Sequence, residues 1–207
     1  MPRAGLTRER VVEEAAAMVD TVGVGSLTLA ALAERLGVRQ PSLYKHMDSL
    51  AALQRSVALL SKRELGAAFA RVAVGRSGSD AIHAMADGYR RWAVLHPGQY
   101  QAAMTMPAPG DVEDEATQMA AIQIIADVLT SYRLEGDDAV DAIRAFRSIL
   151  HGFVSLETSG GFTLAADIDG SFERLIHGFT IALEHWNEPI VREGAVRPLD
   201  SETTTGA

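Results

Sequence analysis

Residues 28–47 read TLAALAERLGVRQPSLYKHM, and this stretch decides the fold. Thr28 is a good N-cap for a helix of about two turns, because its hydroxyl can accept a hydrogen bond from a free backbone N–H group. Gly37 follows the last leucine of this helix and is a typical helix end. Pro41 then falls in the first turn of a second short helix, where its missing N–H has no cost. Two short helices joined by a tight turn predict a helix-turn-helix.

The second short helix is predicted to have an apolar and a polar face. Leu43 and Met47 can pack inward. Such a helix fits the major groove of DNA, where Arg39 can pair with guanine and Gln40 with adenine. The hydroxyl and free N–H groups at Thr28 can hold a phosphate. Alternatively, the polar residues are only the solvated face of an ordinary helix pair. The polar side chains expected outside are Gln40, Ser42, Lys45 and His46.

Helical periodicity continues on both sides of this segment, and glycine and proline separate the helices. A weak strand signal occurs at residues 162–164, and polar residues without periodicity predict a disordered tail at 189–207. The chain is therefore expected to be all-α, with about nine helices. Besides the two short helices, they are expected over residues 7–22, 50–73, 80–96, 113–132, 137–158 and 167–186, with a shorter segment around 99–106.

The composition is that of an ordinary globular protein. Of 207 residues, 47% are hydrophobic and 22% are charged, which excludes a wholly disordered or collagen-like chain. No cysteine is present, so disulfides, thiolate nucleophiles and zinc-thiolate sites are excluded. No apolar run follows the arginines among the first ten residues, and no stretch is apolar enough to span a membrane. We expect a soluble, cytoplasmic protein.

The net charge of −8 is unevenly distributed along the chain. Residues 1–63 hold nine basic and six acidic residues, whereas residues 64–207 hold ten and twenty-one. A basic first segment can meet phosphates, while the acidic remainder is repelled from them. Chance variation over a short segment is the alternative explanation.

The order of residues around the turn resembles a known family. Thr28 is followed by Ala-Glu-Arg-Leu-Gly-Val at residues 33–38 and by Leu-Tyr-Lys-His at residues 43–46. With this pattern, residues 6–53 resemble the DNA-binding domain of TetR-type transcriptional regulators. The resemblance implies phosphate contacts from Thr28 and Tyr44. It also implies base-edge or groove contacts from Gln40, Pro41, Ser42 and His46.

Two positions depart from the family pattern. Arg39 stands where such proteins often have a serine or threonine that caps the recognition helix, and it supplies a cation instead. Leu50 stands where a lysine usually grips the DNA backbone. Arg55, or Arg3 and Arg8 in the N-terminal arm, can replace that contact, unless these arginines only solubilise the surface.

The remainder of the chain resembles a subgroup of the same family, named for Trp, His and Gly in its C-terminal domain. The resemblance covers residues 80–187. It implies a helical body that forms a homodimer and binds a small-molecule effector. The motif residues, in order, are Trp92, His96, Pro97, Tyr100, His151 and Gly152.

The last two long helices are predicted to form the dimer interface. Gly152 and Gly178 lie in the middle of these helices, where each costs about 1 kcal/mol relative to alanine. Close approach of backbones in an intersubunit four-helix bundle would offset that cost and give the two-fold symmetry of paired half-sites. Alternatively, the glycines pack within one subunit. The predicted interface residues are Gly152, Phe153, Gly178, Ala182 and Trp186.

Aromatic and methionine side chains of the body can line a cavity for a largely apolar effector. His96 and His151 can add polar contacts to such a pocket. Each of these residues can instead be ordinary core. The predicted effector-binding residues are Phe69, Met85, Tyr89, Trp92, Met104, Met106, Met119, Phe146 and His151.

Enzyme motifs are absent from the sequence. No nucleophile elbow, zinc-helix, P-loop or dinucleotide motif occurs, and no two histidines have the spacing that chelates a metal. The acidic run at residues 111–115 is expected to be a solvated helix start. We predict a DNA-binding repressor without a cofactor or metal, released by its effector from a palindromic operator. The alternative is a helical enzyme or a protein-interaction module. The predicted domains are residues 1–55 for DNA binding and 56–188 for effector binding and dimerisation.

Overall fold

The computed structural model describes residues 6–188, and the predicted disordered tail at 189–207 lies outside them. The described residues form an all-α fold, as predicted, without a strand at 162–164. None of their helices is both long and apolar enough to cross a membrane. The α-helices are α1 (Arg8–Val22), α2 (Leu29–Leu36), α3 (Leu50–Ala73), α4 (Gly78–Leu95), α5 (Pro97–Ala103), α6 (Val112–Leu129), α7 (Gly136–Thr158) and α8 (Ile168–Glu184). The 3₁₀ segments are η1 (Val24–Ser26), η2 (Gln40–Lys45) and η3 (Thr130–Tyr132).

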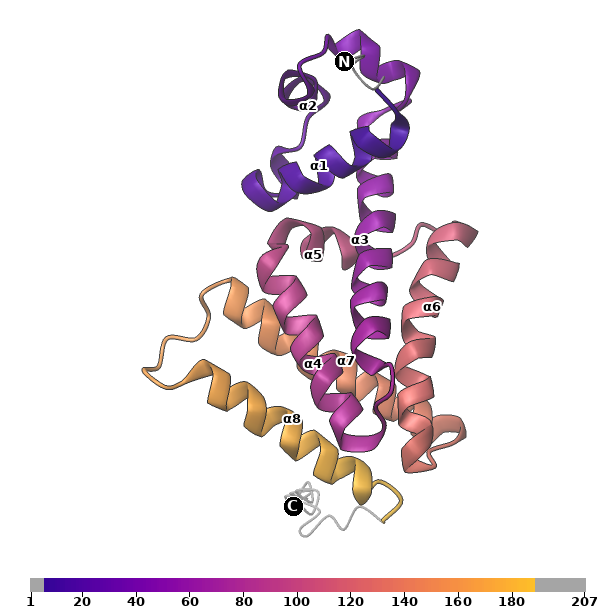
Figure 1. The fold of residues 1–207 in the computed structure, drawn as a ribbon, viewed down its shortest axis with the longest axis vertical. Helices are drawn as coiled ribbons and strands as arrows, with labels where there is room; N and C mark the ends of the chain where they lie inside the picture. Colours follow the sequence, from indigo (N-terminus) through magenta and orange to yellow (C-terminus); the bar gives the residue numbers. More distant parts are fainter. Residues whose placement is uncertain (1–5, 189–207) are drawn as a thin grey trace, which may run out of the picture.

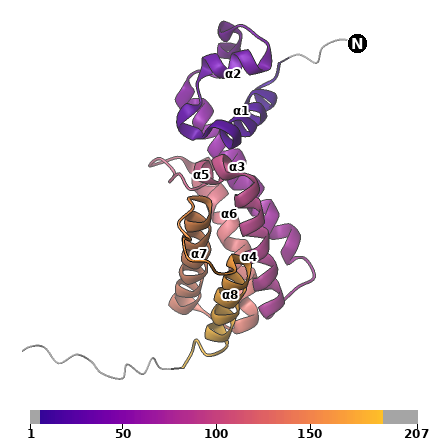
Figure 2. The same ribbon diagram turned by 90° about the vertical axis from the view of Figure 1, so that its left-hand side faces the viewer.

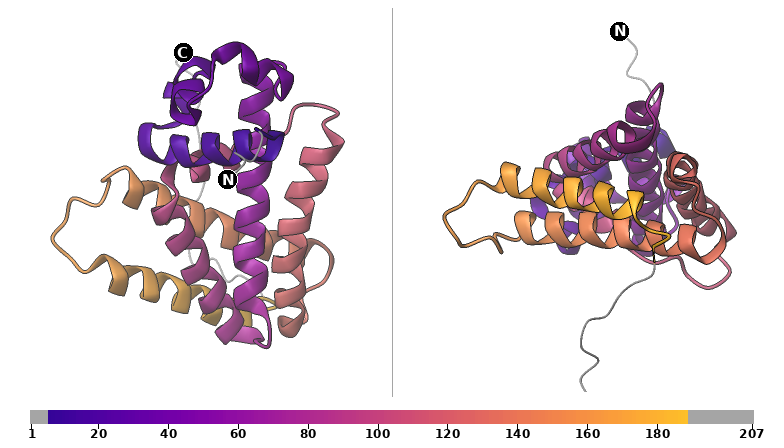
Figure 3. Two further views of the ribbon diagram at one scale, coloured as in Figure 1. Left: turned by 45° about the horizontal axis from the view of Figure 1, so that its top comes forward. Right: turned by 90° about the horizontal axis from the view of Figure 1, so that it is seen from below.

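The long helix α3 runs along the molecule and joins its two parts (Figure 1). A head at one end holds α1, α2 and η2, and α1 packs against the start of α3. The rest of α3 packs against α4 and α6. Across the junction, α5 contacts both α1 and α3. On one flank, α7 and α8 run antiparallel and side by side (Figures 2 and 3).

The predicted third helix is the 3₁₀ segment η2 rather than an α-helix. Hydrogen bonds that span three residues join Ser42 N–H to the Arg39 carbonyl at 2.8 Å and His46 N–H to the Leu43 carbonyl at 2.9 Å. Pro41 has no N–H to donate, and 3₁₀ geometry is common in segments this short. Counted together with η2, the eight α-helices of the described residues make the nine helices that periodicity predicts.

Two hydrophobic cores lie along α3. Leu53 belongs to the head core, whereas Leu65 and Phe69 belong to the body core. The short helix α5 also reaches the head core, through Ala102. The domain boundary predicted at residues 55–56 therefore falls inside one continuous helix that contributes to both cores.

Candidate DNA-binding and effector sites

Backbone caps fix the turn between α2 and η2. The hydroxyl of Thr28 accepts a hydrogen bond from the N–H of Ala31 at 3.2 Å and caps α2, as predicted. Gly37 ends the helix with a φ of 67°, a left-handed conformation that glycine adopts without steric cost. The N–H of Val38 donates to the carbonyl of Ala33 at 2.9 Å and closes the last turn. The chain therefore reverses at once into η2.

The side chains predicted to contact DNA lie around η2 and the start of α2. Leu43 and Met47 are buried in the head core and fix the inner side of this segment. Tyr44, in contrast, is 50% exposed although it is aromatic. Six of the predicted residues are exposed, namely Thr28, Arg39, Gln40, Pro41, Tyr44 and Lys45. The other two, Ser42 and His46, are half-buried.

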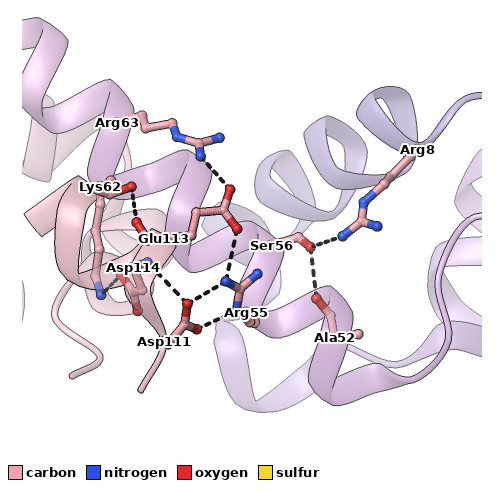
Figure 4. A network of polar contacts seen from close by, with 10 residues as sticks. Arg8, Ala52, Arg55, Ser56, Lys62, Arg63, Asp111, Glu113 and Asp114 are labelled. Atoms are coloured by element: carbon pink, nitrogen blue, oxygen red, sulfur yellow. Dashed lines mark hydrogen bonds and ion pairs between the residues drawn. The ribbon is translucent and has the colours of Figure 1, made fainter. Parts of the chain in front are cut away.

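The predicted substitutes for the missing lysine are engaged within the protein. Leu50 packs against the head core. Arg55 is held by two carboxylates near the start of α6, as Figure 4 shows. Arg8 donates to the hydroxyl of Ser56 at 3.3 Å. Arg3 lies outside the described residues.

A charged cluster joins α3 to the start of α6 (Figure 4). The Arg55 guanidinium donates to Asp111 at 2.6 Å and to Glu113 at 2.9 Å. The hydrogen bond from Arg55 lowers the pKa of Asp111 to about 2. Further along α3, the Lys62 ammonium donates to Asp114 at 2.6 Å, and both side chains are buried. The prediction of a solvated helix start is therefore wrong for Asp111 and Asp114, which are shielded and paired with cations of α3, whereas Glu113 is 53% exposed.

The short helix α5 is anchored to α1 through Asp20. The backbone N–H and the side-chain amide of Gln99 donate to the Asp20 carboxylate at 2.8 and 2.6 Å. The Nδ1 atom of His96 lies 3.0 Å from the same carboxylate. A Cβ atom at Gly98 would lie 2.0 Å from the Val19 carbonyl oxygen, so the two backbones are in close contact. His96 therefore faces the head.

A chain of three polar side chains connects α5 to α4 and α7 of the body. The hydroxyl of Tyr89 donates to the hydroxyl of Tyr100 at 3.0 Å, and the Tyr100 hydroxyl lies 2.6 Å from Nδ1 of His151. Burial raises the pKa of both tyrosines, so their hydroxyls remain protonated at neutral pH. Successive residues of α5 thus bind the head, through Gln99, and the body, through Tyr100.

A cavity of about 330 Å³ lies beside these polar groups, among α3, α4, α6, α7 and the loop after α5. This volume is at the lower end of the range for small-molecule sites, about 300–1,000 Å³. Five predicted effector-binding residues line it, namely Phe69, Tyr89, Met104, Met106 and His151. The other four do not: Met85, Trp92 and Phe146 belong to the body core, and Met119 is 58% exposed on α6. Six polar residues of the lining were not predicted from the sequence, namely Lys62, Thr105, Gln118, Arg144, Arg147 and Ser148.

The predicted interface residues differ in their surroundings. Gly152, Gly178 and Ala182 are exposed, whereas Phe153 is buried against the rings of two other phenylalanines. Trp186 is half-buried and packs edge-on against an aromatic ring of α8. A Cβ atom at Gly152 or Gly178 would meet no atom within 4 Å. Packing within the described part of the subunit therefore does not account for either glycine.

Comparison with known proteins identifies the family. Residues 82–179 match the family described as "Tetracyclin repressor-like, C-terminal domain". An uncharacterized HTH-type transcriptional regulator of Mycobacterium tuberculosis is 45% identical, over 76% of this chain and 72% of the relative. A second uncharacterized HTH-type regulator, YobS of Bacillus subtilis, is 33% identical over 88% of this chain and 95% of the relative. The chain belongs to the TetR family.

The fold agrees with this assignment. A TetR variant from Acinetobacter baumannii, solved in complex with minocycline, superposes with a TM-score of 0.65 at 22% identity. The match covers 89% of this chain and 100% of that structure. As a TetR-family protein, the chain is a helix-turn-helix transcriptional regulator and not an enzyme.

The structure also gives the motif residues of this TetR-family body concrete contacts. The rings of Trp92 and His96 lie with their centroids 5.4 Å apart, next to the junction with the head. Tyr100 and His151 meet through their polar atoms at the cavity wall. The Trp-His-Gly subgroup itself stays a prediction, since the matched family description does not name it. The contact between Trp92 and His96 spans one turn at the end of α4, whereas the contact between Tyr100 and His151 joins α5 to α7 and could not be inferred from spacing.

Proposed function

We propose that this regulator is a homodimeric repressor that binds a palindromic operator and is released from it by a small, largely apolar effector. The exposed and cation-bearing surface of η2, backed by the buried Leu43 and Met47, is the observation that carries the proposal. Such a segment fits the major groove, with its first residues against the base edges. Residues 1–55 would serve DNA binding and residues 56–188 effector binding and dimerisation, in the cytoplasm.

The surface of η2 suggests distinct roles for its side chains. Arg39 and Lys45 form no ion pair among the described residues, so both cations are available to a polyanion. We assign base recognition to Arg39 and Gln40, which lie at the first turn of η2. We assign phosphate contacts to Thr28, Tyr44 and Lys45. The remaining groove contacts fall to Pro41, Ser42 and His46.

The DNA-binding proposal is tested by two substitutions with different expected signatures. Gln40→Ala should relax the preference at one base pair in each half-site, with a cost of about 1–3 kcal/mol on the preferred sequence. Tyr44→Ala should weaken binding by the same factor on every duplex, whatever its sequence. Fluorescence anisotropy with the selected operator and a set of single-base variants measures both effects. An equal loss on every duplex for Gln40→Ala would refute its role in base recognition.

Selection of bound duplexes from a random pool supplies that operator and tests the proposal as a whole. We expect an inverted repeat whose half-site centres are about 34–36 Å apart, one helical turn of DNA. Affinity should fall about 10³–10⁵-fold between 50 and 200 mM salt if the dimer makes six to ten phosphate contacts. Failure to enrich any sequence, together with a flat salt dependence, would contradict DNA binding.

The exposed glycines support a dimer through α7 and α8. Each glycine costs about 1 kcal/mol in helix propensity, and open space on its outer side leaves room for the backbone of a second helix. Apolar side chains lie on the same helices, with Leu156 49% and Ile181 45% exposed. Two copies that pair these helices form a four-helix bundle with two-fold symmetry.

Gly178→Ala is therefore expected to act on assembly rather than on the fold of one subunit. Within the subunit, the new methyl group meets no atom and should favour helix formation. Between subunits, it should push the helices apart and raise the dimer dissociation constant at least about ten-fold, or about 1.4 kcal/mol. Sedimentation velocity across protein concentration measures this constant. Gly25→Ala, in the head and also free of neighbours within 4 Å, is the control. An unchanged dimer would exclude close contact at Gly178.

The effector part of the proposal is supported by the cavity and its connection to α5. Tyr89 and His151 line the cavity, and both contact the hydroxyl of Tyr100. The next residue toward the N-terminus, Gln99, binds Asp20 of the head. A ligand that binds one arrangement of α5 and the cavity more tightly than another favours that arrangement, and α5 would transmit the change to the head.

A further inference from the structure

The charged groups of the cavity lining are all of one sign. Lys62, Arg144 and Arg147 line it, and no carboxylate of the described residues does. The surrounding sequence has the opposite balance, because residues 64–207 hold about twice as many acidic as basic residues. Lys62 lies in the basic first segment, whereas Arg144 and Arg147 belong to the acidic remainder and have the sign opposite to its net charge.

Only one of these cations is free of a carboxylate partner among the described residues. Lys62 is neutralised by the buried Asp114 at 2.6 Å. Arg144 lies 3.1 Å from Asp141, and its side chain is 73% exposed. Arg147 forms no ion pair or hydrogen bond within residues 6–188. Its guanidinium is available to a ligand in the cavity.

The charge of Arg147 also influences Tyr89, a buried residue of the cavity wall. Burial is the main influence on the pKa of Tyr89 and raises it, while the charge of Arg147 acts in the opposite direction. Both residues line the same cavity, from α4 and α7. Arg147 itself is exposed, and its charge is a minor influence on the buried Tyr89.

A second donor lies one helical turn from Arg147. Because Tyr89 donates to Tyr100, the Tyr100 proton is directed at Nδ1 of His151. This arrangement leaves the proton of a neutral His151 ring on Nε2. Arg147 and His151 thus both line the cavity from α7, and no acidic side chain of the described residues lies in the lining.

The rest of the lining is apolar. Leu65 and Phe69 come from α3, Ile122 and Ile125 from α6, and Leu150 from α7. Together with Met104 and Met106 of the loop after α5, they would cover a hydrocarbon or aromatic group. The cavity thus combines an apolar interior with one unpaired guanidinium.

We propose that the effector is an amphipathic carboxylate, whose acid group binds Arg147 and whose apolar part lies against Phe69 and Ile125. A guanidinium presents two parallel donors that match the two oxygens of a carboxylate. One free arginine suits a single negative charge. This inference rests on the proposed effector role of the cavity and names the chemistry of the effector.

The test compares acids with neutral analogues of equal shape. Isothermal titration calorimetry on the full-length protein without DNA uses decanoate against decanamide, and 2-naphthoate against 2-naphthamide. We expect at least one carboxylate to bind ten-fold or more tightly than its amide. Arg147→Gln should reduce this preference to less than about three-fold. Arg91→Gln removes an exposed charge of α4 outside the cavity lining and should retain the preference.

Three results would overturn the inference: amides that bind as tightly as their acids, a preference that survives Arg147→Gln, or no binding of either acid at 1 mM. Duplex binding by the ligand-free protein is measured separately. If the protein binds no duplex while the acid preference depends on Arg147, the repressor proposal fails and the ligand assignment stands.

Discussion

Gly98→Ala is expected to destabilise the protein by about 3 kcal/mol or more, although it adds a single methyl group. The new Cβ would lie 2.0 Å from the carbonyl oxygen and 2.2 Å from the carbonyl carbon of Val19, and 2.7 Å from the nitrogen of Asp20. All three are backbone atoms of α1, so no side-chain rotation relieves the overlap. The contact between α5 and α1 must therefore open.

Opening the junction also removes the polar contacts beside it. Gln99 donates twice to Asp20, and these bonds require α5 to remain in contact with α1. Urea unfolding at a fixed protomer concentration measures the loss, because the stability of a dimer depends on concentration. Gly25→Ala, which meets no atom within 4 Å, should change stability by less than about 0.5 kcal/mol. Equal stabilities for the two variants would contradict the close packing at Gly98.

A second variant distinguishes the polar contact from the steric one. Asp20→Asn keeps the size of the side chain but replaces one acceptor oxygen by a donor, so it cannot accept both bonds from Gln99. It should destabilise the junction less than Gly98→Ala does. If α5 transmits effector binding to the head, the same variant should also reduce release from DNA by the effector.

The helices could be predicted from the sequence because their signals are local. Thr28 caps α2 and Gly37 ends it, and both roles depend on residues within one helical turn. Ser49 caps α3 in the same local way and accepts from the N–H of Ala52 at 3.1 Å. The 3₁₀ geometry of η2 was not predicted, since the four-residue spacing of Leu43 and Met47 is that of an α-helix.

The contacts between helices could not be predicted, because their partners are far apart in the sequence. Asp114 belongs to an acidic run that is typical of a solvated helix start, yet its partner Lys62 lies 52 positions away. Nothing in the sequence around His96 indicates whether its side chain contacts the head or the cavity. Phe69 and Phe146 are both buried apolar residues, and only the fold assigns the first to the cavity wall and the second to the core. Tyr100, by contrast, was named through the family resemblance, which implied no contact for it.

Lys62→Met is expected to cost about 3–5 kcal/mol, because it leaves the Asp114 carboxylate buried without its cation. The two side chains are only 7% and 6% exposed, so bulk solvent screens the remaining carboxylate little. Methionine retains the length and apolar stem of lysine, which limits the change in packing. Urea unfolding measures the loss. Arg63→Met, at the next position of α3, breaks a pair with Glu113 that is more than half exposed and should cost less than about 1 kcal/mol.

The double variant Lys62→Met/Asp114→Leu separates a buried unpaired charge from a favourable ion pair. If the penalty of Lys62→Met comes from the isolated carboxylate, removing that carboxylate should recover most of the lost stability. Additive losses in the double variant would instead show that packing at Lys62 carries the effect. The double variant also tests the proposed effector site, because Lys62 lines the same cavity as Arg147. A ligand acid that binds Arg147 should still be preferred over its amide in the double variant, since Asp114 already neutralises Lys62 in the native protein.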